Sequence, residues 1–302
     1  MASISGTVEF GHALGGRGFT RALLRWAADS RRDLPWRSTR DPWAVLVSEV
    51  LLQQTQASRV EAKYREFLDC WPTPSDLASA DLSELLKFWV GLGYPRRARN
   101  LHRAAQQITN LHQGGVPREL EQLLELPGVG PYTARAVMIF AYEKDLGVVD
   151  TNVGRLLARW CDSSLRPKIA QEIADKLVAP GRSWDWNQGL FDLAATVCTK
   201  RNPQCDACPV NSWCAWHGAG ADPADGSAGV SKKQQPFQGS DRQARGLLMA
   251  ALAQGSIDTS EAAAVMGLLD QQCRATQLVD DLRNEGLIAF QGDVLLLGDL
   301  VK

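Results

Sequence analysis

Four cysteines crowd into one short stretch of the chain and have the spacing of metal ligands. They are Cys198, Cys205, Cys208 and Cys214, in the pattern Cys-x6-Cys-x2-Cys-x5-Cys. Structural zinc and a 4Fe–4S cluster both take four thiolates. Zinc modules usually show two Cys-x2-Cys pairs, and this stretch has one. The spacing therefore favours a 4Fe–4S cluster, with zinc as the alternative.

A basic segment, residues 199–204, separates the first two of these cysteines and contains Lys200 and Arg201. A cluster would fix this loop and present both cations to a phosphate backbone. The total of seven cysteines is odd, which argues against a disulfide framework. The other three are predicted to be small packing residues: Cys70, Cys161 and Cys273.

Two carboxylates also have unusual settings. Glu49 lies inside the apolar run AVLVSEVLLQQ, residues 44–54, although charged side chains are rarely fully buried. From the residues alone, Glu49 is interpreted as a helix-face carboxylate with an exposed edge. Asp150 lies in VVDTNV, where it can cap a helix that begins near Thr151.

The stretch LPGVGPYTARA, residues 126–136, predicts a helical hairpin that binds an anion. Gly128 and Gly130 can both take backbone angles closed to other residues, and Pro131 suits the first turn of a helix. The amide hydrogens of such a turn point outward at a helix N-terminus, which is a site for phosphate.

The elements that must position these residues are mostly helical. Apolar residues recur at helical spacing between residues 19 and 217. Residues 218–240 are rich in Gly, Ala, Ser and Pro and predict a flexible linker. Three helices and a hairpin at Gln291-Gly292-Asp293 follow. This order favours a winged-helix module, and a nondescript helical cap is equally compatible with it.

Composition is that of a soluble globular protein. The 302 residues are 45% hydrophobic and 22% charged, with a net charge of −1. No apolar run approaches the roughly 18 residues of a membrane span, and the first eighteen residues lack a signal-peptide pattern, so a cytoplasmic protein is expected. Nucleic-acid binding would need local basic patches. Two arginine clusters are each interpreted as solvated faces: Arg31, Arg32, Arg37 and Arg40, and Arg96, Arg97 and Arg99.

Taken in order, the hairpin, the downstream aspartate and the cysteine loop resemble the helix–hairpin–helix DNA glycosylase superfamily, which includes endonuclease III. LPWR (34–37), SEVLLQQTQ (48–56) and GLGYPRRARNLHRAA (91–105) are similar to MutY-type adenine DNA glycosylases. The resemblance implies an all-α glycosylase fold. We expect a tail (1–18), a 4Fe–4S cluster domain (19–41 and 151–217), a six-helix barrel domain (42–150), a linker (218–240) and a winged-helix-like module (241–302).

The resemblance also implies catalytic roles. Glu49 corresponds to the acid that protonates adenine at N7, and an apolar setting can raise the pKa of such a carboxyl. Asp150 corresponds to the carboxylate that stabilises positive charge on the sugar, as in glycoside hydrolysis. Tyr132 occupies the position of the Schiff-base lysine of endonuclease III-like lyases. The chain is therefore expected to be a monofunctional glycosylase, with Tyr132 orienting the intermediate.

Double-stranded DNA with adenine opposite 8-oxoguanine or guanine is the implied partner, bound by a nucleoid-associated monomer. Flipping a base out of the duplex needs inserted side chains, which the resemblance assigns to Gln54 and Tyr94. It assigns the adenine pocket to Trp36, Arg37, Leu52 and Gln188. Phosphate contacts are expected from Gly128, Val129, Gly130, Thr133, Lys200 and Arg201.

The chain departs from the family pattern in three places, of which the form V-D-T-N-V around Asp150, in place of V-D-G-N-V, has little weight. The usual second tyrosine after Gly-Leu-Gly is Pro95, so one DNA contact is in doubt. Residues 241–302 are too few for the domain with which many relatives inspect 8-oxoguanine, and Arg242, Arg245 and Arg274 are hypothesised to contact DNA instead. A glycosylase for thymine or uracil opposite guanine is the alternative enzyme. A non-catalytic DNA reader is a further alternative, opposed by the presence of both carboxylates.

Overall fold

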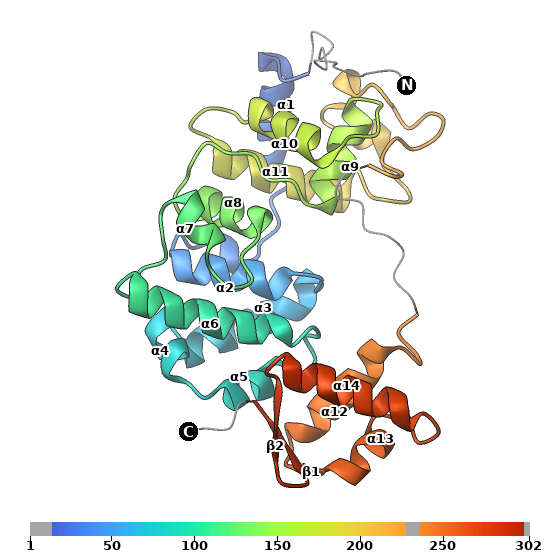
Figure 1. The fold of residues 1–302 in the computed structure, drawn as a ribbon. Helices are drawn as coiled ribbons and strands as arrows, with labels where there is room; N and C mark the ends of the chain where they lie inside the picture. The colour runs from blue at the N-terminus through green and yellow to red at the C-terminus, as the bar shows by residue number, and fades with distance from the viewer. Residues whose placement is uncertain (1–13, 228–235, 299–302) are drawn as a thin grey trace, which may run out of the picture. The chain divides into compact units, whose positions relative to one another are not determined.

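The computed structural model describes residues 14–227 and 236–298 (Figure 1). The chain divides into two compact units, which we describe separately. The first unit is Met1–Leu34 with Ala134–Lys232, and the second unit is Pro35–Thr133 with Lys233–Lys302. The expected domain boundaries at residues 41 and 150 stay predictions. Most of the predicted tail and residues 228–235 of the predicted linker lie outside the described residues.

The first unit is helical in its described part. Phe19 packs edge-on against Trp160 at a centroid distance of 5.0 Å and also contacts Trp186 at 6.0 Å. Such aromatic pairs contribute about 0.5–1.5 kcal/mol beyond their buried area. Its helices are α1 (Arg17–Asp29), α9 (Thr151–Trp160), α10 (Pro167–Leu177) and α11 (Ser183–Thr196), with 3-10 turns at Cys205–Ala207 and Asn211–Trp213.

The second unit contains most of the expected barrel helices, and Figure 1 shows α4 running beside α6. Phe67, Trp71 and Phe88 form an aromatic cluster with centroid distances of 5.0–5.6 Å. The helices are α2 (Pro42–Leu52), α3 (Ala57–Cys70), α4 (Pro74–Ser79), α5 (Leu82–Trp89), α6 (Arg96–Leu111) and α7 (Leu120–Leu124). Helix α8 (Pro131–Phe140) crosses the boundary between the units.

Helix α4 was not expected, because Trp71-Pro72-Thr73-Pro74 has the composition of a turn. Thr73 accepts a hydrogen bond from the backbone N–H of Asp76 at 3.3 Å, and the carboxylate of Asp76 accepts one from the backbone N–H of Thr73 at 3.0 Å. This reciprocal capping box, with Pro74 at the first helical position, begins the helix.

The C-terminal segment has the order of a winged helix. It consists of α12 (Asp241–Leu252), β1 (Ile257–Asp258), α13 (Ala262–Val265), α14 (Gln272–Asn284), β2 (Ile288–Gln291) and β3 (Val294–Leu297). The strands are antiparallel in the order β1-β3-β2, with Phe290 opposite Leu295 and Ile257 opposite Leu295 on its other side. The predicted hairpin is confirmed. Strand β1 was missed because two residues show no alternation.

No helix in the described part of the chain has the length and apolar character that a bilayer crossing requires.

Two helical glycines should respond oppositely to alanine. A Cβ at Gly189 in α11 would lie 2.8 Å from the Cβ of Ala27 in α1, whereas a Cβ at Gly246 in α12 meets nothing within 4 Å. We expect Gly189→Ala to lower the free energy of unfolding by about 1–3 kcal/mol through overpacking. Gly246→Ala, the control, should raise it by about 0.5–1 kcal/mol. Denaturant titration measures both, and equal effects would contradict the packing of α1 on α11.

Candidate active site and cluster loop

Glu49 lies on a helix that is buried along nearly its whole length. Asp41 caps α2 by accepting a hydrogen bond from the N–H of Ala44 at 2.8 Å, and Pro42 occupies the first turn. Every residue from 43 to 51 is buried, and Glu49 is 6% exposed. The interpretation from the residues alone, a carboxylate with an exposed edge, is wrong. Burial therefore covers the whole middle of the helix, the Glu49 side chain included.

Arg97 fixes the C-terminal end of that helix. Its guanidinium donates five hydrogen bonds of 2.8–3.1 Å. The acceptors are the carbonyls of Val50, Leu51, Leu92 and Gly93 and the hydroxyl of Thr55. Burial lowers the pKa of Arg97 to about 10. The expectation that the cluster of Arg96, Arg97 and Arg99 forms a solvated face is therefore wrong for Arg97, which is 8% exposed.

The two predicted insertion residues lie next to the segments that Arg97 holds. Gln54 has φ 56° and Tyr94 has φ 50°, both in the left-handed region that non-glycine residues seldom adopt. Gln54 is exposed and Tyr94 is half-buried. Arg242 of the C-terminal segment donates to the Tyr94 hydroxyl at 3.4 Å. Strained backbone of this kind concentrates at ligand sites and persists only where its surroundings hold it.

Three of the predicted pocket residues lie near the start of the second unit. Trp36 and Arg37 are 9% and 8% exposed, and Leu52 is half-buried. Trp36 packs edge-on against Tyr64 at 5.8 Å. Burial, with a smaller contribution from Asp41, raises the pKa of Tyr64 to about 12. Arg37 is thus not part of a solvated face, as its cluster had suggested.

The predicted hairpin connects α7 to α8, and its two glycines differ. Gly128 has φ +79°, and a Cβ there would lie 2.8 Å from the Cβ of Asn100. The N–H of Val129 donates to the carbonyl of Leu126 at 3.1 Å. Gly130 does not have a positive φ and has open space around it. The expectation of backbone angles closed to other residues is confirmed for Gly128 and wrong for Gly130. At Gly130 a Cβ would meet no atom within 4 Å.

The other residues predicted near the hairpin fall on α8. Thr133 is buried and its hydroxyl accepts a hydrogen bond from the side-chain amide of Gln53 at 3.3 Å. Tyr132 is half-buried at the second position of the helix. Gln53 thereby connects the turn after α2 to the start of α8.

Asp150 caps helix α9 in the first unit. Its Oδ1 accepts from the N–H groups of Asn152 and Val153 at 2.9 and 2.7 Å, and its Oδ2 accepts from the Asn152 amide at 2.9 Å. The predicted capping role is confirmed. The side chain of Asn187, fully buried on α11, accepts a hydrogen bond from the N–H of Val148 at 3.1 Å. This contact fixes the backbone two residues before Asp150. Gln188, the next residue, is also buried.

A second buried arginine connects this cap to the cysteine loop. Arg155 donates to Asn152 Oδ1 at 3.1 Å, to the carbonyl of Cys198 at 3.0 Å and to that of Ala194 at 2.8 Å. Burial lowers its pKa. The orientation of Asp150 is thus coupled through Asn152 and Arg155 to the first cysteine.

The four predicted ligands line one small cavity together with Arg159 and Trp216. A Cβ at Gly218 would lie 3.0 Å from the Sγ of Cys205, so glycine leaves room for the sulfur there. Among the described residues, no three histidine, cysteine or carboxylate side chains form a group that could hold a single metal ion. Four thiols around one cavity are the donor set that a 4Fe–4S cluster takes.

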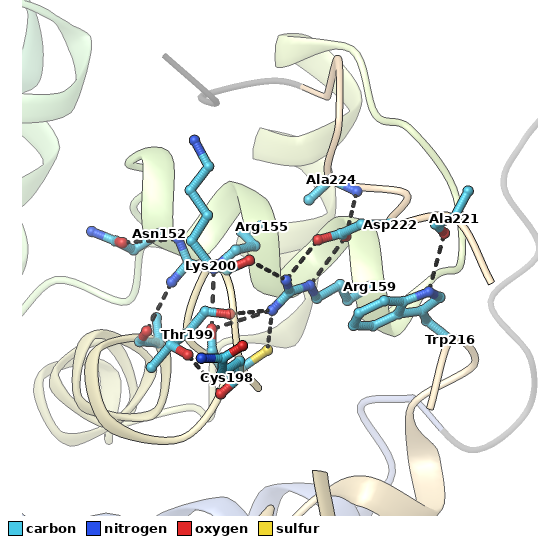
Figure 2. Close-up of polar contacts among 12 residues, drawn as sticks. Asn152, Arg155, Arg159, Cys198, Thr199, Lys200, Trp216, Ala221, Asp222 and Ala224 are labelled. Carbon is cyan, nitrogen blue, oxygen red and sulfur yellow. Dashed lines mark hydrogen bonds and ion pairs between the residues drawn. The ribbon is translucent and has the colours of Figure 1, made fainter. Parts of the chain in front are cut away.

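Arg159 fastens the loop that carries Lys200 (Figure 2). It is 1% exposed and donates to the Sγ of Cys198 at 3.1 Å and to the carbonyls of Thr199 and Lys200 at 2.8 and 3.2 Å. Its charge is balanced by Asp222, which accepts at 3.1 and 2.6 Å. Burial acts to lower the pKa of Arg159, but the hydrogen bonds to Asp222 and Cys198 raise it overall. Lys200 and Arg201 remain exposed, as predicted.

The prediction that the three remaining cysteines are packing residues is wrong for two of them. Cys70 and Cys273 are exposed and so are not packing residues. Of the three C-terminal arginines hypothesised to contact DNA, Arg245 pairs with Glu285 and Arg274 pairs with Asp241. The hypothesis that Arg242, Arg245 and Arg274 contact DNA stays a prediction.

Comparison with known proteins defines the class. Residues 47–180 match the family described as HhH-GPD superfamily base excision DNA repair protein, and residues 198–214 match the iron-sulfur binding domain of endonuclease III. The fold is similar to that of a thermostable thymine-DNA glycosylase, with 35% identity, a TM-score of 0.64 and coverage of 66% of this chain and 95% of that one. A trapped endonuclease III–DNA covalent intermediate matches at 26% identity, a TM-score of 0.57 and coverage of 67% and 95%. These matches define a helix–hairpin–helix base-excision repair protein.

Two named relatives narrow the class further. An adenine DNA glycosylase of Mycobacterium tuberculosis H37Rv is 41% identical over 273 residues, covering 88% of each chain. The human adenine DNA glycosylase is 43% identical over 211 residues, covering 65% of this chain and 39% of that protein. The chain belongs to the adenine DNA glycosylase family. It is a DNA-binding glycosylase of base-excision repair with a 4Fe–4S cluster as cofactor.

Cluster retention should depend on Arg159. Arg159→Lys keeps a positive charge but cannot donate at once to Asp222, Cys198 and the two loop carbonyls. We expect faster loss of the cluster's visible absorption and iron content when a chelator is added. Asp206→Asn, an exposed change on the same loop, is the control. Identical rates in Arg159→Lys and the unaltered protein would contradict the role of this arginine.

Arg97→Lys tests the corresponding contact in the second unit. Lysine retains the charge but leaves several buried carbonyls without donors, so we expect the free energy of unfolding to fall by about 2 kcal/mol or more. Arg103→Lys, exposed on the same helix, should change it by less than about 0.5 kcal/mol. Denaturant titration distinguishes them, and a neutral Arg97→Lys would show that the five hydrogen bonds contribute little.

Proposed function

We propose that this glycosylase excises adenine mispaired with 8-oxoguanine or guanine and leaves an abasic site without cutting the strand. The observation that carries the proposal is the burial of Glu49, a carboxyl group 6% exposed on a mostly apolar helix. The similarity to adenine DNA glycosylases supports adenine as the base that is excised. That reaction requires an acid that is still protonated near neutral pH.

Glu49 supplies that acid. Burial disfavours the charged form of a carboxyl group, and the proposal is that Glu49 donates a proton to the base. Delivered to N7 of a flipped-out adenine, the proton neutralises charge that develops on the departing base. General acid catalysis of this kind contributes about 10²–10⁴-fold. The proton moves from an Oε of Glu49 to the base, and the bond between the sugar and the base breaks with its electron pair leaving on adenine. Water then adds to the sugar cation and loses a proton, which gives the abasic site.

Asp150 acts on the sugar. As the glycosidic bond breaks, positive charge develops on the sugar ring, and an oriented carboxylate stabilises it. The three donors from Asn152 and Val153 fix the direction of the Asp150 carboxylate before the substrate arrives. A carboxylate that is already oriented stabilises the transition state effectively, because the protein does not have to rearrange around it during the reaction.

Strand cleavage is not expected. A lyase needs an amine that forms a Schiff base with the sugar, and the position that would hold it is Tyr132, half-buried on α8. The tyrosine hydroxyl cannot form that adduct. We propose that it orients the abasic product.

Base extrusion is assigned to Gln54 and Tyr94. Their left-handed backbones project from the two segments that Arg97 ties to α2, the helix of Glu49. Trp36, Arg37, Leu52 and Gln188 are proposed to contact the adenine. Backbone contacts to phosphate are proposed for Gly128, Val129 and Gly130, beside Thr133, and side-chain contacts for Lys200 and Arg201. We further propose that the protein acts as a monomer.

Excision assays test the proposal on duplexes with A opposite 8-oxoguanine, A opposite G and T opposite G, with and without alkali. The unaltered protein should yield alkali-dependent cleavage on the two adenine substrates. Glu49→Gln should slow single-turnover excision by at least about 100-fold. Asp150→Asn should also slow it, while asparagine still caps α9.

Glu66→Gln, a change at an exposed carboxylate of α3, serves as the control and should leave the rate unchanged. Full activity of Glu49→Gln would refute the acid role. Cleavage of the T:G duplex alone would favour the thymine glycosylase alternative, and no cleavage of any duplex would favour a non-catalytic reader.

A further inference from the structure

A groove on the first unit combines a basic rim with an apolar floor. It lies between α1 and the segment from α10 to α11 and encloses about 810 Å³. None of the described residues that line it carries a carboxylate. Its cationic side chains are Arg17, Arg21, Arg25, Lys176 and Arg182. Arg182 pairs with Asp185 at 2.9 Å. Because the net charge of the whole chain is only −1, the other four cations are still a local concentration.

Three of the cations share one face of α1. Arg17, Arg21 and Arg25 recur every four residues, about 6 Å apart along the helix axis, and all three are exposed. They form no ion pair with a carboxylate of the described residues. Like charges at this spacing oppose helix formation by about 0.2–0.5 kcal/mol per pair.

The helix dipole adds to this local cost. The first turn of α1 has no acidic residue, and a cation there is unfavourable by about 0.3–1 kcal/mol. The arrangement therefore opposes the local stability of α1, and an anionic ligand would remove the cost.

The floor of the groove is apolar. Leu24 of α1 lines the groove together with Leu177, the last residue of α10, and with Val178 and Pro180, which follow that helix. A phosphate backbone has no group that would cover these side chains. An apolar side chain of a ligand would be buried here, with a gain of about 25 cal/mol for each Å² removed from water.

Two features argue against nucleic acid as the occupant. Single strands are held by aromatic side chains on which bases stack, and none of the described residues in the lining is aromatic. A duplex contacts a protein through its phosphates and the edges of its bases in the grooves. The leucine, valine and proline side chains would then have no apolar group to pack against. Negative charge and apolar side chains occur together in acidic peptide segments.

We propose that this groove binds an extended acidic segment of a partner protein, with carboxylates against Arg21 and Arg25 and apolar side chains on Leu24 and Leu177. The site is separate from the residues assigned to base excision. Charged residues at the rim of a binding site accelerate association with a partner of opposite charge and make binding depend on salt concentration. The groove would thus recruit the glycosylase to a partner while the DNA-binding residues remain available.

Fluorescence anisotropy tests the proposal with the full-length protein and a short labelled peptide of aspartates, glutamates and two leucines. We expect saturable binding that weakens as salt is added. Replacing the carboxylates with amides, or the leucines with serines, should each weaken it. Reversal of two rim charges in R21E/R25E should raise the Kd by roughly tenfold or more, since each tenfold is about 1.4 kcal/mol.

R103E, which reverses an exposed charge on α6, is the matched control and should leave peptide affinity unchanged. Circular dichroism and visible absorption of the cluster check that R21E/R25E is folded, and its excision rate should equal that of the unaltered protein. Equal peptide affinity in R21E/R25E would overturn the proposal. So would displacement of the peptide by a thymidine oligonucleotide whose own binding R21E/R25E abolishes, because the groove would then be a nucleic-acid site.

Discussion

Buried guanidinium groups that satisfy backbone carbonyls are the contacts on which the functional segments depend. Loops that carry functional residues lack the internal hydrogen bonds of helices, yet buried carbonyls need donors. One arginine offers five N–H groups in a rigid fork. Arg97 uses this fork to join the end of α2 to the turns beside Gln54 and Tyr94. Arg159 uses it to join α9 to the loop of Lys200.

These contacts explain how stability and reactivity coexist in one chain. The helix of Glu49 is apolar enough to keep a carboxyl group away from water, and the residues proposed to extrude the base have uncommon backbone angles. Both features cost free energy, of order 1–3 kcal/mol for each strained residue. A hydrogen bond to a charged group returns about 1.5–3 kcal/mol, so a single arginine can offset the strain of the turns that it holds.

The sequence allowed the helices, the hairpin of the C-terminal segment, the cap at Asp150 and the cysteine loop to be predicted, because each has a local pattern of spacing or capping. Arg97 and Arg37 were misassigned, because a local cluster of arginines has the same appearance whether its members face solvent or carbonyls distant in sequence. The partnership of Arg159 with Asp222 joins residues 63 positions apart, and no periodicity reports it. Helix α4 was missed although its capping box is visible in Thr73-Pro74-Ser75-Asp76.

Asp222 lies beyond the last cysteine, outside the residues 198–214 that define the iron–sulfur binding domain. A chain shortened to end just after Trp216 would retain every thiol of the cysteine loop and the indole ring over Arg159, yet leave that enclosed guanidinium without its counter-ion Asp222. An uncompensated enclosed cation costs about 3–5 kcal/mol. The minimal glycosylase portion of this protein therefore extends at least to Asp222, and trimming at the family boundary would yield a weakened fragment.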